Sequence, residues 1–268
     1  MSVGCSLIGY KTCIVAYADD IILLAPTYRG LQLLLDNLQA LLTGLCLKVN
    51  ADKSIYIVFK HKAHTPVNSP NVSLNGKTLT RESNCKYLGV FLNENSNIGH
   101  DIDRITNSFL KQFNGMYSKF YFVDRSVLFY LFKSYTSSFY GIEVWYEKIL
   151  GYQLNRISVA YHKAVKRICG NNVWDSNHDA CDTVGVHIFR HLLAKKLVCF
   201  WHRICNSRSS CLFNLRYYFR YNSCIFNKIS SIFHANYSVD ISSNPLCAIL
   251  ARIQYVQRNE PRSHYAGP

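Results

Sequence analysis

Two adjacent carboxylates between two short apolar runs limit what this chain can fold into more than any other feature. The runs, residues 12–17 and 21–25, are rich in β-branched and aromatic side chains and are too short for helices. That composition is typical of β-strands. Asp19 and Asp20 lie between the runs, where a continuous strand would turn one of them toward a core. We therefore expect a hairpin with both carboxylates at its turn.

The two carboxylates need either solvent or a cation. Neither Asp19 nor Asp20 has a Lys or Arg close to it in the sequence, and unpaired carboxylates beside apolar strands repel each other and resist burial. A divalent cation would remove this conflict, and Mg²⁺ prefers oxygen ligands of this kind. A solvated Asp-Asp turn is the alternative, and these residues alone leave it open.

The charge of the chain points to a polyanionic partner. Its 268 residues include 30 Lys and Arg against 16 Asp and Glu, which gives a net charge of +14. An excess of this size is typical of proteins that bind nucleic acid, although solubility alone is an alternative. A hydrophobic content of 49% with 17% charged residues excludes a disordered chain. The length suits one large domain or two small ones.

Cysteine content and hydropathy indicate an intracellular protein. The chain has 11 cysteines, an odd number without a regular framework, and no leading signal segment, which favours a reducing compartment. No apolar run reaches the length of about 18 residues that a membrane span needs. The first expected strand begins about ten residues after Met1, which leaves little room for the partner strands of a buried hairpin. We therefore expect the chain to be the later part of a larger protein.

A helix and further strands follow the hairpin. Leucines at helical spacing predict a helix over residues 28–44, with Thr27 as its N-cap and Gly44 as its C-cap. The other expected elements are strands at residues 47–49 and 54–59, a hairpin around Asn75-Gly76 within residues 72–79, and a single strand over residues 85–92. This order predicts an α+β fold in which a helix packs on an antiparallel sheet.

The pattern becomes helical after a boundary near residues 93–97. The expected helices run from 98 to about 120, from an N-cap at Asp124 to about 145, from 153 to 169 with Gly170 after it, and from 188 to 205. Between the last two, residues 171–187 are expected to form a break. The aromatic side chains of residues 109–145 lie at helical spacing, which favours a core over stacking platforms for bases.

The order of these motifs resembles the second half of the palm domain of a reverse transcriptase, an RNA-directed DNA polymerase. The motifs are Y-A-D-D-I (17–21), G-L-C-L-K-V-N-A-D-K-S (44–54) and K-Y-L-G-V-F-L (86–92), and they are most similar to those of non-LTR (LINE-type) retrotransposons. The resemblance implies a partial palm at residues 1–94, an all-α thumb at residues 95–170 and a helical C-terminal extension at residues 171–268. In the helical part it is looser and rests on Y-G-I-E-V-W (140–145) and R-I-C-G (167–170).

The resemblance implies a reaction in which two Mg²⁺ or Mn²⁺ ions assist the addition of deoxynucleotides to a DNA primer on an RNA template. Asp19 matches the hairpin carboxylate that binds the ions, and Asp20 matches its neighbour. Lys53 matches a lysine near the leaving pyrophosphate, where a cation stabilises developing charge; a solvated lysine is the alternative. The remaining implied contacts, to the primer, are those of Tyr17, Ala18, Tyr87, Leu88 and Gly89, and for the last three an ordinary edge strand is the alternative.

The family's third metal ligand, an Asp on an upstream palm strand, has no match in this sequence, and neither have the fingers. Because a positioning error of about 1 Å can cost about 100-fold in rate, we expect this chain alone to be inactive. A non-catalytic RNA- or DNA-binding remnant of a retrotransposon is a second hypothesis, and an unrelated α+β domain with a solvated Asp-Asp turn is a third. The resemblance to this family also implies that the protein acts in the nucleus.

Three basic residues on one expected helix fit contacts to a nucleic-acid backbone. Lys163, Lys166 and Arg167 are close enough in the sequence to form one face that follows the phosphates of a template–primer duplex. A solvated face is the alternative.

A group of cysteines and a histidine could bind zinc. Cys199, His202, Cys205 and Cys211 are close in the sequence, but they lie within a helical pattern with apolar neighbours. That pattern favours buried thiols over a zinc site.

Overall fold

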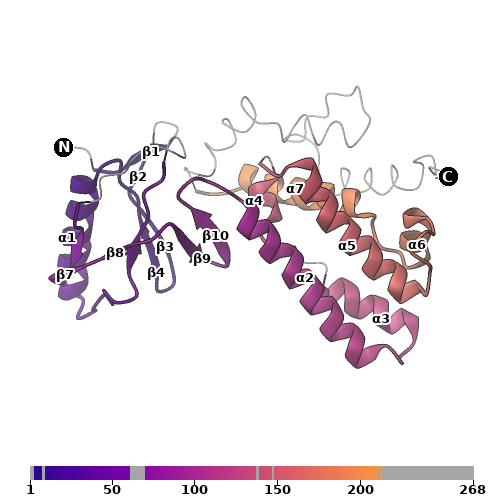
Figure 1. Ribbon diagram of the computed structural model, residues 1–268. Helices are drawn as coiled ribbons and strands as arrows, with labels where there is room; N and C mark the ends of the chain where they lie inside the picture. Colours follow the sequence, from indigo (N-terminus) through magenta and orange to yellow (C-terminus); the bar gives the residue numbers. More distant parts are fainter. Residues whose placement is uncertain are drawn as a thin grey trace, which may run out of the picture. The chain divides into compact units, whose positions relative to one another are not determined.

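The computed structural model describes residues 3–7, 10–60, 70–136, 139–146, 148–209 and 212. The chain divides into two compact units, residues 1–97 and residues 98–268 (Figure 1). Small sheets and a helix make up the described part of the first unit, and helices make up that of the second. The α+β class expected from the sequence is thereby confirmed.

Each described strand of the first unit pairs with one other strand. The antiparallel hairpins are β1 (Cys5–Leu7) with β2 (Tyr10–Thr12), β3 (Ile14–Tyr17) with β4 (Asp20–Leu23), β6 (Ser73–Leu74) with β7 (Lys77–Thr78), and β9 (Asn84–Tyr87) with β10 (Val90–Asn93). A further pair, β5 (Ile55–Tyr56) with β8 (Thr80–Arg81), is parallel. The hairpin predicted around the two carboxylates is therefore present as β3–β4.

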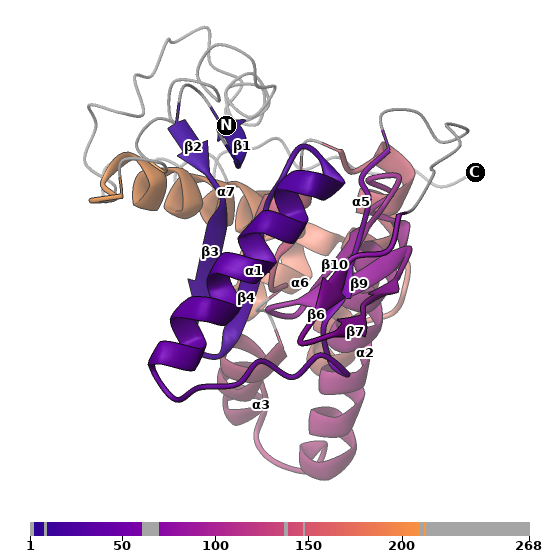
Figure 2. The same ribbon diagram turned by 90° about the vertical axis from the view of Figure 1, so that its left-hand side faces the viewer.

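The helix of the first unit, α1 (Tyr28–Gly44), packs on β4 and β6 (Figure 2). Thr27 caps it as predicted, because its hydroxyl accepts a hydrogen bond from the Gly30 N–H at 3.1 Å. Gly44 is the last helical residue, and the C-cap is Leu45, one residue later than predicted. Apolar side chains of α1 and of the segments around it form a small core, which consists of Leu35, Tyr56, Val72, Leu74 and Leu79.

The strands predicted after α1 are right only in part. Residues 47–49 form no strand, because the Leu47 N–H donates to the Leu42 carbonyl at 2.8 Å and so folds back on the end of α1. Within residues 54–59, the paired residues are those of β5. The hairpin at Asn75-Gly76 is confirmed, and the positive φ angles of these residues, 53° and 76°, are those that a two-residue turn requires.

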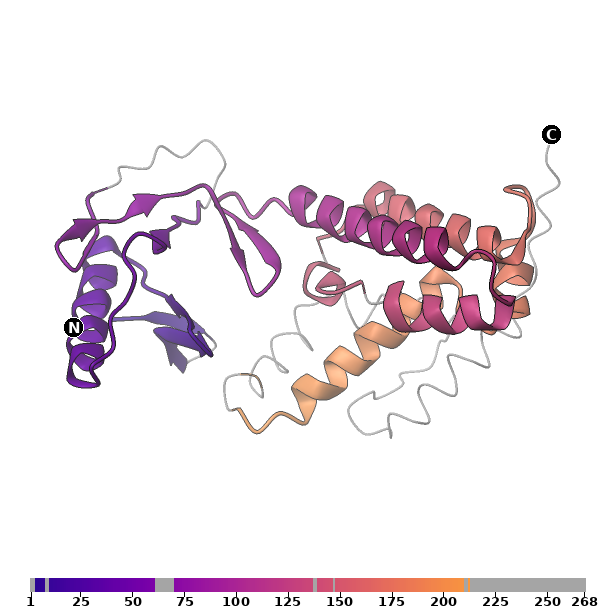
Figure 3. The same cartoon turned by 90° about the horizontal axis from the view of Figure 1, so that it is seen from below.

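Helices form the described part of the second unit (Figure 3). They are α2 (Gly99–Phe120), α3 (Arg125–Leu131), the π-helical segment η1 (Phe132–Thr136), α4 (Ile142–Trp145), α5 (Gly151–Cys169), α6 (Asn177–Thr183) and α7 (Phe189–Cys205). The predictions for α2, α5 and α7 are confirmed to within two residues at each end. None of the helices in the described ranges combines the length and the apolar character needed to cross a membrane.

Two other predictions in the second unit are wrong. The helix expected from the Asp124 cap to about residue 145 is interrupted: α3 gives way to η1, and Gly141, with a φ of 88°, precedes the short α4. The break expected at residues 171–187 contains α6, whose N-cap Ser176 accepts a hydrogen bond from the Asp179 N–H at 3.3 Å. This Ser-x-x-Asp spacing was the available signal for a helix start.

Aromatic side chains form the centre of the core of the second unit. Phe109 stacks on Phe139, with ring centroids 5.0 Å apart, and meets Phe132 edge-on at 6.3 Å. Tyr161 of α5 lies 5.7 Å from Phe189 of α7. All five side chains are buried. The core predicted for the aromatic run is therefore confirmed at Phe109, Phe132 and Phe139.

A buried carboxylate joins the start of α2 to α4. Asp101 is 1% exposed. Its Oδ1 accepts a hydrogen bond from Arg104 Nε at 2.6 Å, and its Oδ2 accepts one from the Trp145 indole N–H at 2.6 Å. Arg104 also donates to the Tyr140 carbonyl at 3.0 Å. These bonds compensate the burial of the charge and hold the segment after η1 against α2.

The imidazole of His162 links α5 to α7. Its Nε2 accepts a hydrogen bond from the Phe189 N–H at 3.3 Å, and its Nδ1 lies 3.3 Å from the Ser158 hydroxyl. An acceptor at Nε2 requires the neutral ring. Burial lowers the pKa of His162 from 6.5 to about 4, and the nearby Lys166 and His178 also lower it.

Acidification from pH 7 to pH 4 is expected to destabilise the second unit through His162. Between pH 6.5 and about 4 the unfolded chain binds a proton that the folded chain does not. The contribution of His162 to the free energy of unfolding is therefore fully present above this pH range. It falls as the pH drops through the range, by up to about 3 kcal/mol. Urea unfolding at several pH values would measure the fall. The H162Q variant should show a weaker pH dependence, and an unchanged one would contradict this assignment.

Candidate active site

Asp19 and Asp20 lie at the end of the β3–β4 hairpin. Tyr17, the last residue of β3, pairs with Asp20, the first residue of β4, so Ala18 and Asp19 form the turn. Both carboxylates are exposed. In the described part of the chain, neither makes a hydrogen bond or an ion pair. The hairpin therefore presents two adjacent negative charges to solvent.

The strand pairing decides which side chains share a face of this hairpin. Alternate residues of a strand point to opposite faces, so Tyr17 and Asp20 lie on one face and Leu23 lies on the other. Leu23 packs against the small core of the first unit. The face that carries Tyr17 and Asp20 is consequently directed away from that core, and Tyr17 is 65% exposed. A ligand could reach this face without displacing core side chains.

The turn holds an alanine in an unfavourable conformation. Ala18 has a φ of 52°, in the left-handed region, which costs a residue other than glycine roughly 1–2 kcal/mol. Such strain persists where the surrounding structure imposes it, and it clusters at functional sites. Here the pairing of Tyr17 with Asp20 fixes both ends of the turn. The strained backbone therefore sets the positions from which the two carboxylates project.

The carboxylate pair fits a divalent cation in its chemistry and in its accessibility. Asp19 and Asp20 supply hard oxygen ligands of the kind that Mg²⁺ takes, and both are exposed without a cationic partner among the described residues. Three or more His, Cys, Asp or Glu side chains in a metal-binding arrangement do not occur in the described part of the chain. Asp19 and Asp20 could thus supply two of the ligands of a metal ion.

Lys53 lies in an exposed turn between α1 and β5. Asn50 shapes this turn: its Oδ1 accepts a hydrogen bond from the Asp52 N–H at 2.9 Å, and its carbonyl accepts one from the Ser54 hydroxyl at 2.8 Å. Asp52 is paired with Lys77. Lys53 has no hydrogen-bond or ion-pair partner among the described residues. Its ammonium group is therefore available to a ligand or to solvent.

Tyr87, Leu88 and Gly89 form the end of a second hairpin, and the single strand predicted over residues 85–92 is wrong. β9 ends at Tyr87, which pairs with Val90 of β10. Leu88 and Gly89 have positive φ angles of 45° and 82°, which a tight two-residue turn requires. Gly89, which lies inside the predicted strand, is thus the second residue of a turn.

Glu94 anchors the base of this second hairpin. Its carboxylate accepts hydrogen bonds from Lys60 Nζ at 2.8 Å and from Arg81 Nη2 at 3.0 Å. The hydrogen bond from Lys60, followed by the charges of Lys60 and Arg81, lowers the pKa of Glu94 below its ordinary value. The Lys60 N–H also donates to the Glu94 carbonyl at 2.8 Å. The hairpin is therefore held at its base by an ion-paired carboxylate.

The three basic residues predicted to follow a duplex lie on α5. Lys166 Nζ donates to the Val173 carbonyl at 2.7 Å. The guanidinium of Arg167 stacks on the Tyr117 ring of α2, 4.4 Å from its centroid. Lys163 is exposed and has no partner among the described residues. Lys166 and Arg167 thus already have contacts within the second unit. Of the three cations, Lys163 is the one whose charge is most available to a ligand.

The residues considered for zinc lie on α7, apart from Cys211, which is outside the described residues. Cys199, His202 and Cys205 are each half-buried. At about 100° per residue, their three-residue spacing turns successive side chains about 60° apart. The helix alone therefore does not converge all three on one point.

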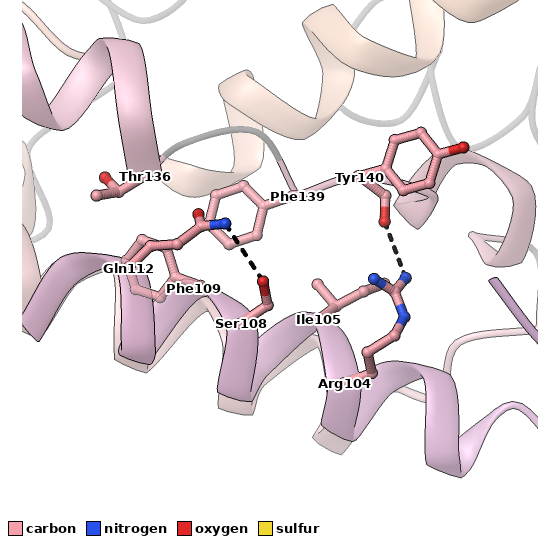
Figure 4. A pocket seen from close by; sticks show the side chains of 8 residues that line it. All are labelled: Arg104, Ile105, Ser108, Phe109, Gln112, Thr136, Phe139 and Tyr140. Carbon is pink, nitrogen blue, oxygen red and sulfur yellow. Dashed lines mark hydrogen bonds between the residues drawn. The ribbon is translucent and has the colours of Figure 1, made fainter. Parts of the chain in front are cut away.

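A pocket in the second unit was not predicted from the sequence (Figure 4). It has a volume of about 220 Å³ and is lined by Arg104, Ile105, Ser108, Phe109, Gln112, Thr136, Phe139 and Tyr140. Gln112 donates to the Ser108 hydroxyl at 3.4 Å, and Arg104 donates to the Tyr140 carbonyl. The spacing of the α2 residues marks one helix face. Because Gln112 bonds to Ser108, Arg104 bonds to the Tyr140 carbonyl, and the rings of Phe109 and Phe139 belong to the core, we assign no ligand to this pocket.

Comparisons with known proteins agree with the family resemblance found in the sequence. No family model matches the chain, and no solved structure gives a significant match. The probable RNA-directed DNA polymerase from transposon BS of Drosophila melanogaster is 36% identical over 102 residues, which cover 36% of this chain and 11% of that protein. The RNA-directed DNA polymerase from mobile element jockey of the same species is 28% identical over 170 residues, which cover 59% of this chain and 18% of that protein.

The chain thus spans less than a fifth of the length of either relative, since the matches cover 11% and 18% of them. Both relatives are polymerases of mobile elements, which is the class that the motifs around Asp19 and Tyr87 resemble. These matches confirm the resemblance found in the sequence: over part of their length, the chain is similar to the reverse transcriptases of non-LTR mobile elements.

Proposed function

We propose that the chain is the later part of a non-LTR retrotransposon reverse transcriptase, with a partial palm at residues 1–94, a thumb at residues 95–170 and a helical extension at residues 171–268. The observation that carries the proposal is the exposed Asp19–Asp20 pair at the β3–β4 turn, in a chain similar to RNA-directed DNA polymerases. The complete enzyme adds deoxynucleotides to the 3′ end of a DNA primer along an RNA template, releases pyrophosphate and acts in the nucleus.

In this function the β3–β4 turn holds the reaction centre. When bound, Mg²⁺ or Mn²⁺ supplies Lewis acidity toward the primer hydroxyl and the leaving pyrophosphate. Asp19 binds the ions through its carboxylate, and Asp20 adds a second negative charge beside it. Neither carboxylate has to give up a partner among the described residues. Lys53 stabilises the charge that develops on the pyrophosphate, as an unpaired cation in an exposed turn is free to do.

The two hairpin turns of the first unit position the primer in this proposal. Tyr17 and Ala18 lie beneath its 3′ terminus, which the exposure of Tyr17 and its shared face with Asp20 support. Tyr87, Leu88 and Gly89 contact its backbone at the β9–β10 turn. The absence of a side chain at Gly89 lets another backbone approach this turn closely.

The test is primer extension on an RNA template in the presence of Mg²⁺. We expect no extension by the chain alone, because two carboxylates without the family's third ligand hold metal ions poorly. A polymerase extended upstream of Met1 by the adjoining coding sequence should extend the primer and should lose this activity on replacement of Asp19. Extension by the chain alone would contradict the first expectation, and an inactive extended polymerase would contradict the assignment.

Replacing Lys163 with alanine is expected to weaken binding of an RNA–DNA duplex and to lower its salt dependence. One lost phosphate contact should reduce the slope of log affinity against log salt by about 1. Lys163 is the best of the three cations to replace, because replacing Lys166 or Arg167 would also remove a contact within the fold. The matched control is K148A, which removes an exposed lysine that precedes α5. Equal slopes for K163A and the parent would contradict a phosphate contact.

A non-catalytic RNA- or DNA-binding remnant is the second candidate, and the net charge of +14 favours it. The two candidates differ in one measurement. A remnant binds RNA or DNA in a salt-dependent way, yet the upstream-extended polymerase does not extend a primer.

A further inference from the structure

Three of the exposed aromatic side chains of the second unit lie in connections between its helices. Trp174, in the connection between α5 and α6, is 94% exposed. Tyr121 and Phe122, in the connection between α2 and α3, are 64% and 74% exposed. Large aromatic rings stabilise a fold when they are buried, so stability alone does not explain these positions. Exposed aromatic residues that gather in one patch mark contact sites for a ligand or a partner.

The two connections lie at the same end of the helical unit (Figures 1 and 3). Arg167, in the last turn of α5, stacks on Tyr117, in the last turn of α2. Arg125, the first residue of α3, places Nη2 3.0 Å from the position that a Cβ on Gly170 would take, directly after α5. We call the surface formed by Tyr121, Phe122 and Trp174 the aromatic end.

Hydrogen bonds hold Trp174 in a fixed turn. The Asn172 N–H donates to Asp175 Oδ2 at 2.6 Å, and the Asp175 N–H donates to the Asn172 carbonyl at 3.2 Å. Lys166 ties the same turn to α5 through its bond to the Val173 carbonyl. Trp174 is therefore presented to solvent by an ordered backbone, which lowers the entropy that a ligand would lose in binding it.

The other two rings also belong to an ordered turn. The rings of Tyr121 and Phe122 meet edge to face at 5.8 Å. The Val123 N–H donates to the Phe120 carbonyl at 3.1 Å and closes the turn. The aromatic end thus carries a flat indole and a pair of mutually supported rings.

Cations surround the aromatic end. Residues 119–125 and 163–175 hold five Lys and Arg against two Asp. Both carboxylates accept hydrogen bonds from backbone N–H groups: Asp124 from Ser126 at 2.7 Å, and Asp175 from Asn172 in the Trp174 turn. Cations in the last turns of α2 and α5 also offset the helix dipoles, but that does not explain the exposed rings. Flat rings together with cations are the combination that binds unpaired bases and their phosphates.

We propose that the aromatic end binds single-stranded nucleic acid. Trp174 and the Tyr121–Phe122 pair stack on unpaired bases, and Lys119 and Arg125 contact the phosphates between them. The excess of cations favours this ligand over an apolar protein partner. The proposal does not depend on polymerase activity, because it uses residues of the second unit alone.

The test compares oligonucleotides with and without bases. The full chain is titrated with a fluorescent single-stranded oligonucleotide and with an abasic one of the same length and charge. The W174A and Y121A/F122A variants should each bind the base-containing strand about tenfold more weakly and the abasic strand as the parent does. W174F, which keeps a ring, should recover most of the affinity. The matched control is Y152A, which removes an equally exposed ring, 64%, from the first turn of α5 at the opposite end of that helix.

Tryptophan fluorescence gives a second measurement. Trp201 is 2% exposed and Trp145 is half-buried, so Trp174 is the described tryptophan that solvent reaches most readily. The base-containing strand should quench its emission, and the abasic strand should not. Unchanged affinity in both ring variants would overturn the proposal, and so would equal quenching by the two strands. Self-association that W174A abolishes, with oligonucleotide affinity unchanged, would identify a contact between copies instead and would likewise overturn it.

Discussion

Replacing Asp19 with alanine is expected to lower primer extension by the upstream-extended polymerase about 1000-fold, which corresponds to roughly 4 kcal/mol of transition-state stabilisation. The expected loss is large because, in the proposed function, the Asp19 carboxylate would hold ions that supply Lewis acidity to both the attacking and the leaving oxygen. Asp19 is exposed in a turn and has no partner among the described residues, so its removal costs the fold little. Steady-state rates of nucleotide incorporation would measure the effect.

The matched control for Asp19 is D36N in the same unit. Asp36 is an exposed carboxylate on α1 that accepts a hydrogen bond from the Gln32 side chain at 2.8 Å. The D36N polymerase should keep its rate, and circular dichroism should show both variants folded. The D19N variant, which retains shape but loses charge, should also require more Mg²⁺. Incorporation within tenfold of the parent in D19A would exclude Asp19 as a metal ligand.

The second large effect is expected at Asp101, where alanine should lower the free energy of unfolding of the second unit by about 3–5 kcal/mol. The substitution leaves the Arg104 guanidinium and the Trp145 indole N–H without the carboxylate to which they now donate at 2.6 Å. Desolvated donors of this kind are costly. Urea unfolding, followed by circular dichroism of the helices, would measure the loss.

Asp103, on the same helix, supplies the control for Asp101. Its carboxylate is 50% exposed and pairs at 3.0 Å with Arg156, whose side chain is 55% exposed. D103A should therefore cost less than about 1 kcal/mol, as exposed ion pairs do. A D101A/W145F double variant should lose less than the sum of the two single variants, because the two residues share a hydrogen bond. Similar losses in D101A and D103A would contradict the buried network.

Local signals explain which elements could be predicted. The β3–β4 hairpin, the Thr27 cap of α1 and the Asn75-Gly76 turn are each specified by residues close to one another in the sequence. The long amphipathic helices α2, α5 and α7 follow from apolar spacing alone. The positions of Asp19 and Asp20 at a turn were accessible for the same reason.

The features that could not be predicted from the sequence depend on backbone angles or on contacts between distant residues. Residues 85–92 read as one apolar strand, because nothing in their composition shows that Leu88 adopts a positive φ before Gly89. The network of Asp101, Arg104 and Trp145 joins residues 44 positions apart, and no local pattern reports such a contact. Likewise, helical spacing predicted a core for the aromatic residues of 109–145, but it could not show that Tyr121 and Phe122, just beyond the predicted end of α2, are exposed.

The unequal cores of the two units bear on how the chain melts. Among its described residues, the first unit has two-stranded sheets and five buried apolar side chains, from Leu35 to Leu79, and isolated two-stranded ribbons are marginally stable in water. The second has an extended aromatic and aliphatic interior that runs from Ile98 to Trp201. Heating should therefore disrupt the ribbons first and the helices later, in separate cooperative steps. Helical ellipticity would follow mainly the later step, by which point the β3–β4 turn, which we propose to bind metal, would already be lost.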